Sequence, residues 1–207
     1  MSIELIIQAT EDLDWKQCEQ SGMWRTTDGV HSYWIDTADD GYYVEVIDDP
    51  DYADRWFKHH NAVINYINRF SDPFMVLNSS KCTICGTVLK SLHRHDFVGC
   101  KCEGEGKVFI DGGNAYKRSV GAFKQLLNLD VKSNAPHGVI REALHRSGRG
   151  RDGKGEWVWT VMSEMSDDYL DNLITYMEDV DNYNNPYYSM YLAEKDYRKF
   201  HNISIKD

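Results

Sequence analysis

The stretch KCTICG, residues 81–86, and the stretch GCKC, residues 99–102, bring four of the five cysteines within 21 positions of one another. The first pair has the spacing C-x2-C, which directs two thiolates toward one point. Fourteen residues separate it from the second pair, and a hairpin of that length can complete a tetrahedral site of four sulfurs. We therefore predict one structural zinc ion, held by Cys82, Cys85, Cys100 and Cys102.

Two histidines between the cysteine pairs leave the ligand set open. The second pair has the less common spacing C-x-C, so His93 or His95 can replace one cysteine. We expect His95 and Asp96 to form hydrogen bonds with the zinc thiolates or with the hairpin backbone. The alternative is a catalytic metal on His93, His95 and Asp96, because imidazole and carboxylate groups both bind divalent ions. Cys18 lies far away in the sequence and is expected to be a small buried side chain.

Composition and charge narrow the class of protein. The 207 residues permit one medium domain or two small ones, and 42% hydrophobic residues are enough to build a core. A net charge of -10 disfavours general attraction to DNA, RNA or an anionic membrane, although a local basic patch can still bind phosphate. No apolar run approaches the roughly 18 residues of a membrane span, and no signal-peptide pattern opens the chain. Four cysteines within 21 residues do not resemble the disulfide framework of a secreted protein, so we expect the chain to be located in a reducing cytoplasm.

The pattern of the chain predicts an α+β fold in three regions. The first region, residues 1–73, contains Asp28-Gly29 and Asp40-Gly41, which are hairpin turn signals because glycine tolerates a positive φ. Aromatic and β-branched residues around these turns predict a small antiparallel meander. The predicted elements are a strand at 4–7, a short helix at 12–20, strands at 23–27, 30–37 and 42–47, and a helix at 52–70.

The second region, residues 74–130, is predicted to be a zinc-ribbon-like β unit with strands at 74–77 and 107–110. The third region, residues 131–207, is predicted to be mainly helical, with a helix at 137–145 and a strand at 157–162. Ser166 is positioned to cap a helix whose apolar residues recur at helical spacing. That buried stripe is expected to contain Leu170, Leu173, Ile174 and Met177, and a final helix is expected from Pro186 to about His201.

A basic glycine-rich loop stands out in this acidic chain. Arginine side chains suit phosphate or carboxylate oxygens, and glycines let the backbone approach a ligand closely. Nucleic acid, a nucleotide or an acidic protein surface is therefore a candidate ligand, and the alternative is a solvated connection balanced by acidic residues of the chain itself. The loop does not match G-x4-G-K-[ST], which disfavours a Walker-type nucleotide site. Its candidate binding residues are Arg146, Arg149, Arg151 and Lys154.

Tyrosines near the C-terminus are candidates for a protein interface, because they combine a large apolar ring with a polar group. Such an interface is compatible with a homo-oligomer, in which two copies of the chain contact each other. The candidates are Tyr183, Tyr187, Tyr188 and Tyr191.

The motifs of the central region, taken together, resemble the pattern of one protein family. The run Cys82-x2-Cys85, His95-Asp96-Phe97, Cys100-x-Cys102, Ile110-Asp111-Gly112-Gly113 and Tyr116-x-Arg118 resembles an uncharacterised zinc-ribbon-like family of tailed-phage accessory proteins. The resemblance covers about Lys81 to Arg118, and it is weaker for the C-terminal tail. It brings no known reaction and no catalytic residue.

The resemblance implies a non-enzymatic, zinc-stabilised accessory protein that binds and modulates a host or defence-system component in the host cell cytoplasm. Two other classes stay open at this point. One is a metal-dependent hydrolase or nuclease that uses His93, His95 and Asp96. The other is a nucleic-acid-binding zinc-ribbon module that uses the basic loop.

Overall fold

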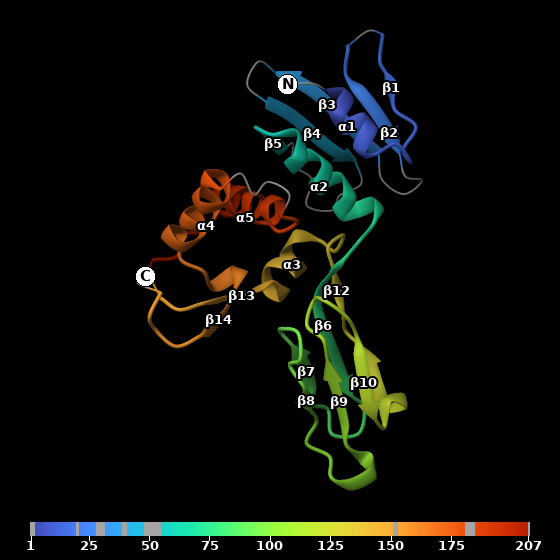
Figure 1. The fold of residues 1–207 in the computed structure, drawn as a ribbon, viewed down its shortest axis with the longest axis vertical. Helices are drawn as coiled ribbons and strands as arrows, with labels where there is room; N and C mark the ends of the chain where they lie inside the picture. Colours follow the sequence, from blue (N-terminus) through green and yellow to red (C-terminus); the bar gives the residue numbers. More distant parts are fainter. Residues whose placement is uncertain are drawn as a thin grey trace. The chain divides into compact units, whose positions relative to one another are not determined.

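A meander of antiparallel strands forms the first part of the fold (Figure 1). The computed structural model describes residues 3–19, 21–27, 32–38, 41–47, 55–150, 153–180 and 185–206. Alternate side chains of the long strands are buried, as in a sheet with one covered face: Tyr33 and Ile35 on one strand, Val44 and Val46 on the next. The strands lie in the order β1 Lys16–Gln17, β2 Trp24–Thr27, β3 Ser32–Ala38, β4 Gly41–Ile47 and β5 Arg55–Phe57.

The three predicted strands of the meander are confirmed as β2, β3 and β4, with bounds that differ by one or two residues. Their register pairs Trp34 with Arg25 on one side and with Glu45 on the other. The predicted turn at Asp28-Gly29 lies outside the described residues, and so does Asp40 of the second predicted turn.

Three expectations for this region are wrong. Residues 4–7 belong to helix α1 Ile3–Ala9, which packs against α2 and buries Ile6. Residues 12–19, predicted as a helix, contain a turn and strand β1, which pairs with β2. The predicted helix at 52–70 begins later, as α2 His60–Ser71, because Arg55 and Phe57 are buried on alternate positions of strand β5. Short apolar runs fit a helix and a strand equally well, and packing decides between them.

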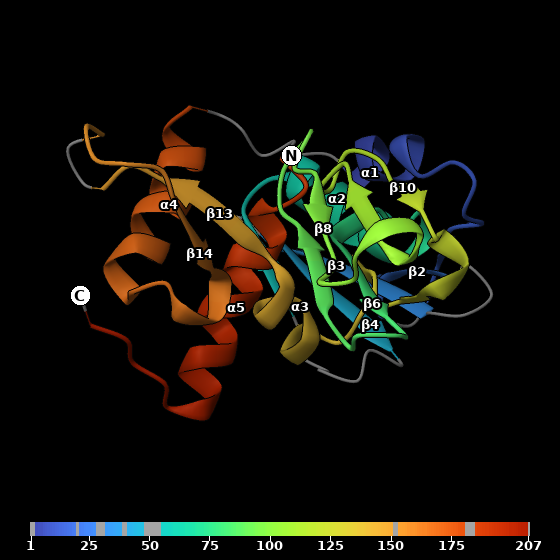
Figure 2. The same ribbon diagram turned by 90° about the horizontal axis from the view of Figure 1, so that it is seen from below.

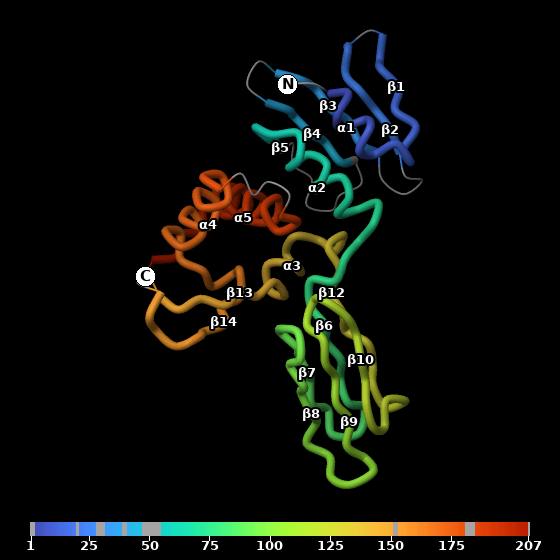
Figure 3. Tube along the Cα trace, in the orientation of Figure 1, coloured from blue at the N-terminus to red at the C-terminus, as the bar shows by residue number. Residues whose placement is uncertain are grey.

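The chain divides into two compact units, each of which is described by itself. The first unit contains residues 1–72 and 164–207, so the C-terminal helices fold with the N-terminal meander. Within this unit α2 packs against the sheet and against α5 Tyr188–His201. Figure 3 follows the chain out of the unit after α2 and into strand β6. In the described part of the chain, no helix has the length and apolar character needed to cross a membrane.

Helix α4 Asp167–Asp179 begins at the predicted cap. The Ser166 Oγ atom accepts a hydrogen bond of 3.2 Å from the Tyr169 N–H group. The predicted apolar stripe is confirmed, because all four of its residues are buried where α4 packs in the first unit; they are Leu170, Leu173, Ile174 and Met177. The predicted final helix is confirmed as α5, which ends at Asn202 in the left-handed region with φ 54°.

Two of the four tyrosines predicted at an interface lie in the core instead, whereas Tyr187 is half-buried. Tyr188 and Tyr191 are only 3% and 1% exposed, so they belong to the core of the first unit. The Tyr188 hydroxyl donates a hydrogen bond of 2.9 Å to Glu178 Oε1, which satisfies its polar group inside the unit. Tyr183 lies outside the described residues.

The second unit, residues 73–163, is built around strand β6 Met75–Cys82. Strand β6 pairs with β7, β11 and β12, and β9 pairs with β8 and β10. All these pairings are antiparallel, and β6 is longer than the strand predicted at 74–77. The other strands are β7 Val88–Ser91, β8 Val98–Gly99, β9 Val108–Asp111, β10 Arg118–Gly121, β11 Leu126–Asn128 and β12 Val131–Lys132.

Helix α3 His137–Ala143 and a two-stranded hairpin complete the second unit (Figure 2). The hairpin pairs β13 His145–Gly148 with β14 Val158–Val161, which matches the predicted strand at 157–162 with shorter bounds. The fold is α+β, as predicted. The division of the chain differs from the three predicted regions: residues 131–163 belong with the β unit, and residues 164–207 belong with the meander.

A buried ion pair anchors the C-terminal helices of the first unit. Arg198 is 4% exposed, and its Nε atom donates a hydrogen bond of 2.7 Å to the fully buried Glu194. Its Nη1 atom donates to the Met165 carbonyl at 2.8 Å and to Asp167 Oδ1 at 2.9 Å. Hydrogen bonds from Ser204 and Arg198 lower the pKa of Asp167 below its usual value. This carboxylate therefore stabilises the fold above about pH 4, and its contribution is lost as the pH falls through the lowered pKa.

We expect Arg198→Met to destabilise the protein by about 3 to 5 kcal/mol, because it removes the positive charge that compensates the buried Glu194 carboxylate. Lys195→Met is the matched control, since its ion pair with Asp171 is more than half exposed and contributes about 1 kcal/mol or less. Urea unfolding of the full chain measures both changes. Equal effects of the two substitutions would show that the buried pair does not anchor these helices.

Candidate metal centre

The first cysteine pair lies in the turn that ends β6. Cys82 is the last residue of the strand, and its N–H group donates a hydrogen bond of 2.9 Å to the Thr87 carbonyl. The Gly86 N–H group donates to the Cys82 carbonyl at 2.9 Å, and Gly86 has φ 71°, which glycine adopts without strain. Thr83 donates to the Gln125 carbonyl through its N–H and hydroxyl groups. These bonds hold the turn beside the residues that lead into β11.

The second pair lies in the turn between β8 and β9. The Cys100 N–H group donates to the Val108 carbonyl at 2.9 Å, and the Val108 N–H group donates to Cys100 Sγ at 3.4 Å. A short 3-10 helix, η1 Gly104–Gly106, closes the turn after Cys102. The backbone therefore holds Cys100 at the base of the turn, and an N–H group stabilises negative charge on its sulfur.

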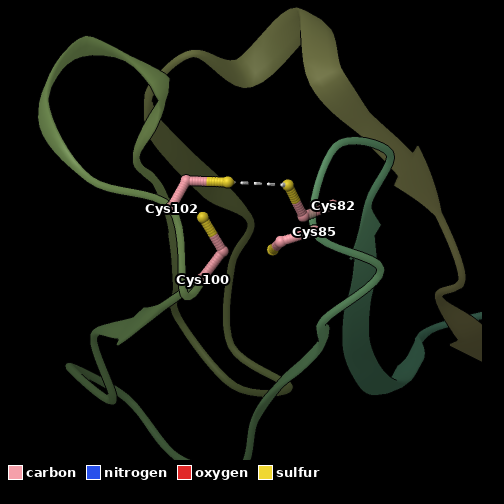
Figure 4. A group of neighbouring side chains, drawn as sticks. All are labelled: Cys82, Cys85, Cys100 and Cys102. Atoms are coloured by element: carbon pink, nitrogen blue, oxygen red, sulfur yellow. Dashed lines mark hydrogen bonds between the residues drawn. The ribbon is translucent and has the colours of Figure 1, made fainter.

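The four sulfurs converge on one point (Figure 4). All four lie within 4.8 Å of one another, and the Cys82 and Cys102 sulfurs are 3.8 Å apart. A tetrahedral ion with Zn–S bonds of about 2.3 Å places its ligand sulfurs about 3.8 Å apart, which fits this geometry. A disulfide needs sulfurs about 2 Å apart, and none of the four cysteines forms one. The donor set and its spacing are those of a four-thiolate metal site.

Burial and hydrogen bonding shift the pKa values of Cys85 and Cys102 in opposite directions. The Thr87 hydroxyl lies 3.1 Å from Cys85 Sγ, and bonds from Thr87 lower the pKa of Cys85 to about 5. Burial and the neighbouring thiols raise the pKa of Cys102 to about 12. A second thiolate beside the first is costly, so a divalent cation at the centre is what allows all four sulfurs to be ionised together.

The histidines do not join the cysteine cluster. Among the described residues, the cysteines form the only group of three or more His, Cys, Asp or Glu side chains placed to hold an ion. His93 stacks on Trp159 with ring centroids 5.5 Å apart. The Asp96 carboxylate accepts a hydrogen bond of 2.7 Å from the Leu92 N–H group, which is a contact with the hairpin backbone. The geometry therefore places four cysteines, and neither His93 nor His95, around the candidate metal position.

His95 belongs to a polar network that the sequence reasoning did not identify. The Tyr116 hydroxyl donates to Asp111 Oδ2 at 2.9 Å, so its contact of 3.1 Å with His95 Nδ1 is one in which the histidine nitrogen donates. Arg118 lies 2.9 Å from the same Asp111 oxygen, and the Asn78 side chain donates to the Asp111 carbonyl. Asp111 is 2% exposed, so these contacts stabilise a buried carboxylate. The spacing of Asp111, Tyr116 and Arg118 across the hairpin between β9 and β10 is the sequence signal for this network.

The predicted basic loop belongs to the hairpin β13–β14. Arg146 lies on β13 opposite Thr160, and it is half-buried. Arg149 follows β13, donates a hydrogen bond of 2.9 Å to the Gly155 carbonyl, and places its guanidinium 5.6 Å from the centre of the Trp157 ring. Lys154 is exposed, and Arg151 lies outside the described residues. Arg146, Arg149 and Lys154 therefore belong to one hairpin. This hairpin is more than 40 residues from the cysteine cluster in the sequence.

The first unit contains a groove between β5, α4 and α5, lined in part by Trp56, Ile174, Leu192 and Phe200. Arg55 Nη1 lies 3.1 Å from Asp196 Oδ2, and Lys195 Nζ lies 2.7 Å from Asp171 Oδ1. The groove thus presents paired charges beside apolar side chains.

Residues 75–121 match a family described as Domain of unknown function (DUF7695). The match begins with the first residue of β6, ends with the last residue of β10 and contains all four clustered cysteines. No curated protein and no solved structure matches the chain significantly. The family match therefore marks the cysteine-containing strands as a recurring unit and brings no activity with it.

We expect Cys82→Ser to abolish tight metal binding, because it removes a buried ligand from a site whose binding energy is folding energy. Cys18→Ser is the matched control, since Cys18 lies outside the cluster and should leave about one ion per chain. Elemental analysis of reduced, freshly purified protein measures zinc and iron separately. Metal retained at full stoichiometry in Cys82→Ser would show that the four sulfurs are not the ligands.

Proposed function

We propose that this chain is a zinc-stabilised, non-enzymatic binding protein in which one zinc ion holds residues 73–163 together. The observation that carries the proposal is the convergence of four thiol sulfurs within 4.8 Å of one another. Four protein ligands complete a tetrahedral zinc site and leave no position for a substrate or a water molecule. Zinc in such a site would stabilise the fold and supply no Lewis-acid chemistry.

The enzyme alternative has less support. A metal-dependent hydrolase would need His93, His95 and Asp96 to direct their donor atoms at one ion. The two rings instead contact different partners, Trp159 on β14 and Tyr116 in the turn before β10, and one Asp96 oxygen accepts a backbone hydrogen bond. His93 Nε2 and Asp96 Oδ1 lie 3.9 Å apart, which fits a loose ion pair better than shared coordination.

We expect removal of the metal from reduced wild-type protein to unfold the second unit selectively. Its buried cluster consists of Cys82, Leu89, Cys100, Val108 and Ile110, so without an ion little apolar burial holds the two cysteine turns together. Hydrogen exchange measured by mass spectrometry should show lost protection in residues 75–128 and retained protection in α2, α4 and α5. Zinc should restore the protection. Unchanged exchange after complete removal of zinc would refute the structural role.

The resemblance noted in the sequence extends the proposal to a partner: a host or defence-system protein that a phage accessory protein binds and modulates. The support for this part comes from the sequence motifs alone. We expect the tagged full chain to retain a specific bacterial protein from lysate, and Cys82→Ser to lose it if the second unit makes the contact. Reconstitution of the complex from the two purified proteins is the decisive measurement. Failure of the purified proteins to bind one another would contradict the proposed partner.

A further inference from the structure

The two units of the chain carry opposite charge. Residues 73–163 contain 14 Lys and Arg against 8 Asp and Glu, which is a formal net charge of +6. The remaining residues contain 9 Lys and Arg against 25 Asp and Glu, which is -16. The net charge of -10 for the whole chain is therefore the sum of a basic unit and a strongly acidic unit. The total charge disfavours binding to nucleic acid, whereas the net positive charge of residues 73–163 favours it.

One face of the hairpin β13–β14 presents aromatic rings beside this positive charge. Ser147 pairs with Trp159 and Gly148 pairs with Val158, and Arg149 and Trp157 are the residues that adjoin this last pair. Trp157 directly precedes β14 and lies two residues before Trp159, a spacing that puts the side chains of an extended segment on the same side. Trp157 is 65% exposed, and the Arg149 guanidinium lies 5.6 Å from its ring centre. The hairpin therefore holds a large flat ring and a cation together in solvent.

The loop between β7 and β8 adds a second aromatic pair to this face. His93 stacks on Trp159 with ring planes 19° apart and centroids 5.5 Å apart. The exposed Arg94 follows His93 directly, and exposed Lys154 lies in the loop of the hairpin. Glu156 is the exposed acidic residue of the same described loop segment, 153–157.

We propose that the face formed by His93, Arg149, Trp157 and Trp159 binds single-stranded nucleic acid. An exposed ring such as Trp157 stacks on an unpaired base, and arginine and lysine side chains pair with the phosphates beside it. The proposal rests on the zinc-stabilised second unit proposed above, because His93 reaches Trp159 from the segment that connects the two cysteine turns. It names a ligand class for this unit.

The observations favour single strands over two other polyanions. A base-paired duplex stacks its bases internally and offers no free base to an exposed tryptophan. An acidic protein surface would pair with the arginines, but it would leave Trp157, the most exposed of the large apolar side chains on this hairpin, without a stacking partner. The combination of stacking rings and cations is what identifies the ligand.

The test measures binding of the full chain to fluorescein-labelled single-stranded DNA and RNA of about 20 nucleotides by fluorescence anisotropy. We expect binding that weakens steeply as salt rises, because phosphate contacts release counterions. Trp157→Ala should weaken it about tenfold or more, whereas Trp157→Phe should retain most of the affinity because it preserves a stacking ring. Arg149→Gln should reduce the slope of log K against log salt by about one. The DNA and RNA arms show which strand is preferred.

Matched controls come from the acidic unit. Phe200 is 82% exposed on α5, and Arg25 lies over the Trp34 ring at 5.8 Å, so Phe200→Ala and Arg25→Gln repeat the same chemical changes there. Both should leave binding unchanged. Equal loss in the controls would overturn the proposal, because the contacts would then not belong to the hairpin. Undiminished binding by Trp157→Ala, with poly-glutamate competing as well as the oligonucleotide, would overturn it in favour of an acidic protein ligand.

Zinc content measured on the same samples keeps the two proposals apart. A preparation with about one zinc ion per chain that binds neither oligonucleotide overturns the nucleic-acid proposal and leaves the structural zinc in place. A preparation without zinc that binds through Trp157 and Arg149 overturns the structural zinc alone.

Discussion

The approach of four sulfurs is the interaction on which, in our proposal, the second unit depends. Strands β6 and β8 end in turns that belong to different hairpins, and few buried apolar side chains join those hairpins beyond Leu89, Val108 and Ile110. So small an apolar cluster usually needs a metal or disulfides to be stable. The two cysteine turns supply the ligands for such an ion, and the N–H group of Val108 and the hydroxyl of Thr87 are placed to stabilise charge on the sulfurs.

The first unit is stabilised differently. Its sheet buries alternate residues against α2, and α5 returns from the end of the chain to pack on that helix. Inside it the Arg198 guanidinium satisfies the Glu194 carboxylate, the Met165 carbonyl and Asp167. A buried charge is tolerated only with such a complete set of partners, so this network specifies how the C-terminal helices meet. The discontinuous unit therefore depends on contacts between residues more than 100 positions apart in the sequence, such as Arg55 with Asp196.

Charge follows the division into units. The basic hairpin β13–β14 lies next to the acidic helix α4 in the sequence, yet the two belong to different units. Residues 131–207 include both the basic hairpin of the second unit and the acidic helix α4 of the first unit. The net charge of that whole range therefore does not show the positive charge of the second unit. The proposed nucleic-acid face combines this hairpin with His93 from the cysteine-containing part of the same unit, which stacks on Trp159.

The sequence by itself determined the features that depend on short separations along the chain. The cysteine spacing predicted the cluster, the Ser166 cap and the apolar stripe predicted α4, and aromatic and β-branched residues around Asp-Gly turn signals predicted β2, β3 and β4. Features that depend on distant partners needed the tertiary structure: residues 4–7 are helical where α1 packs on α2, and Tyr188 is buried with its hydroxyl donating a hydrogen bond to Glu178. Local spacing limits the conformations open to a segment, and long-range burial selects among them.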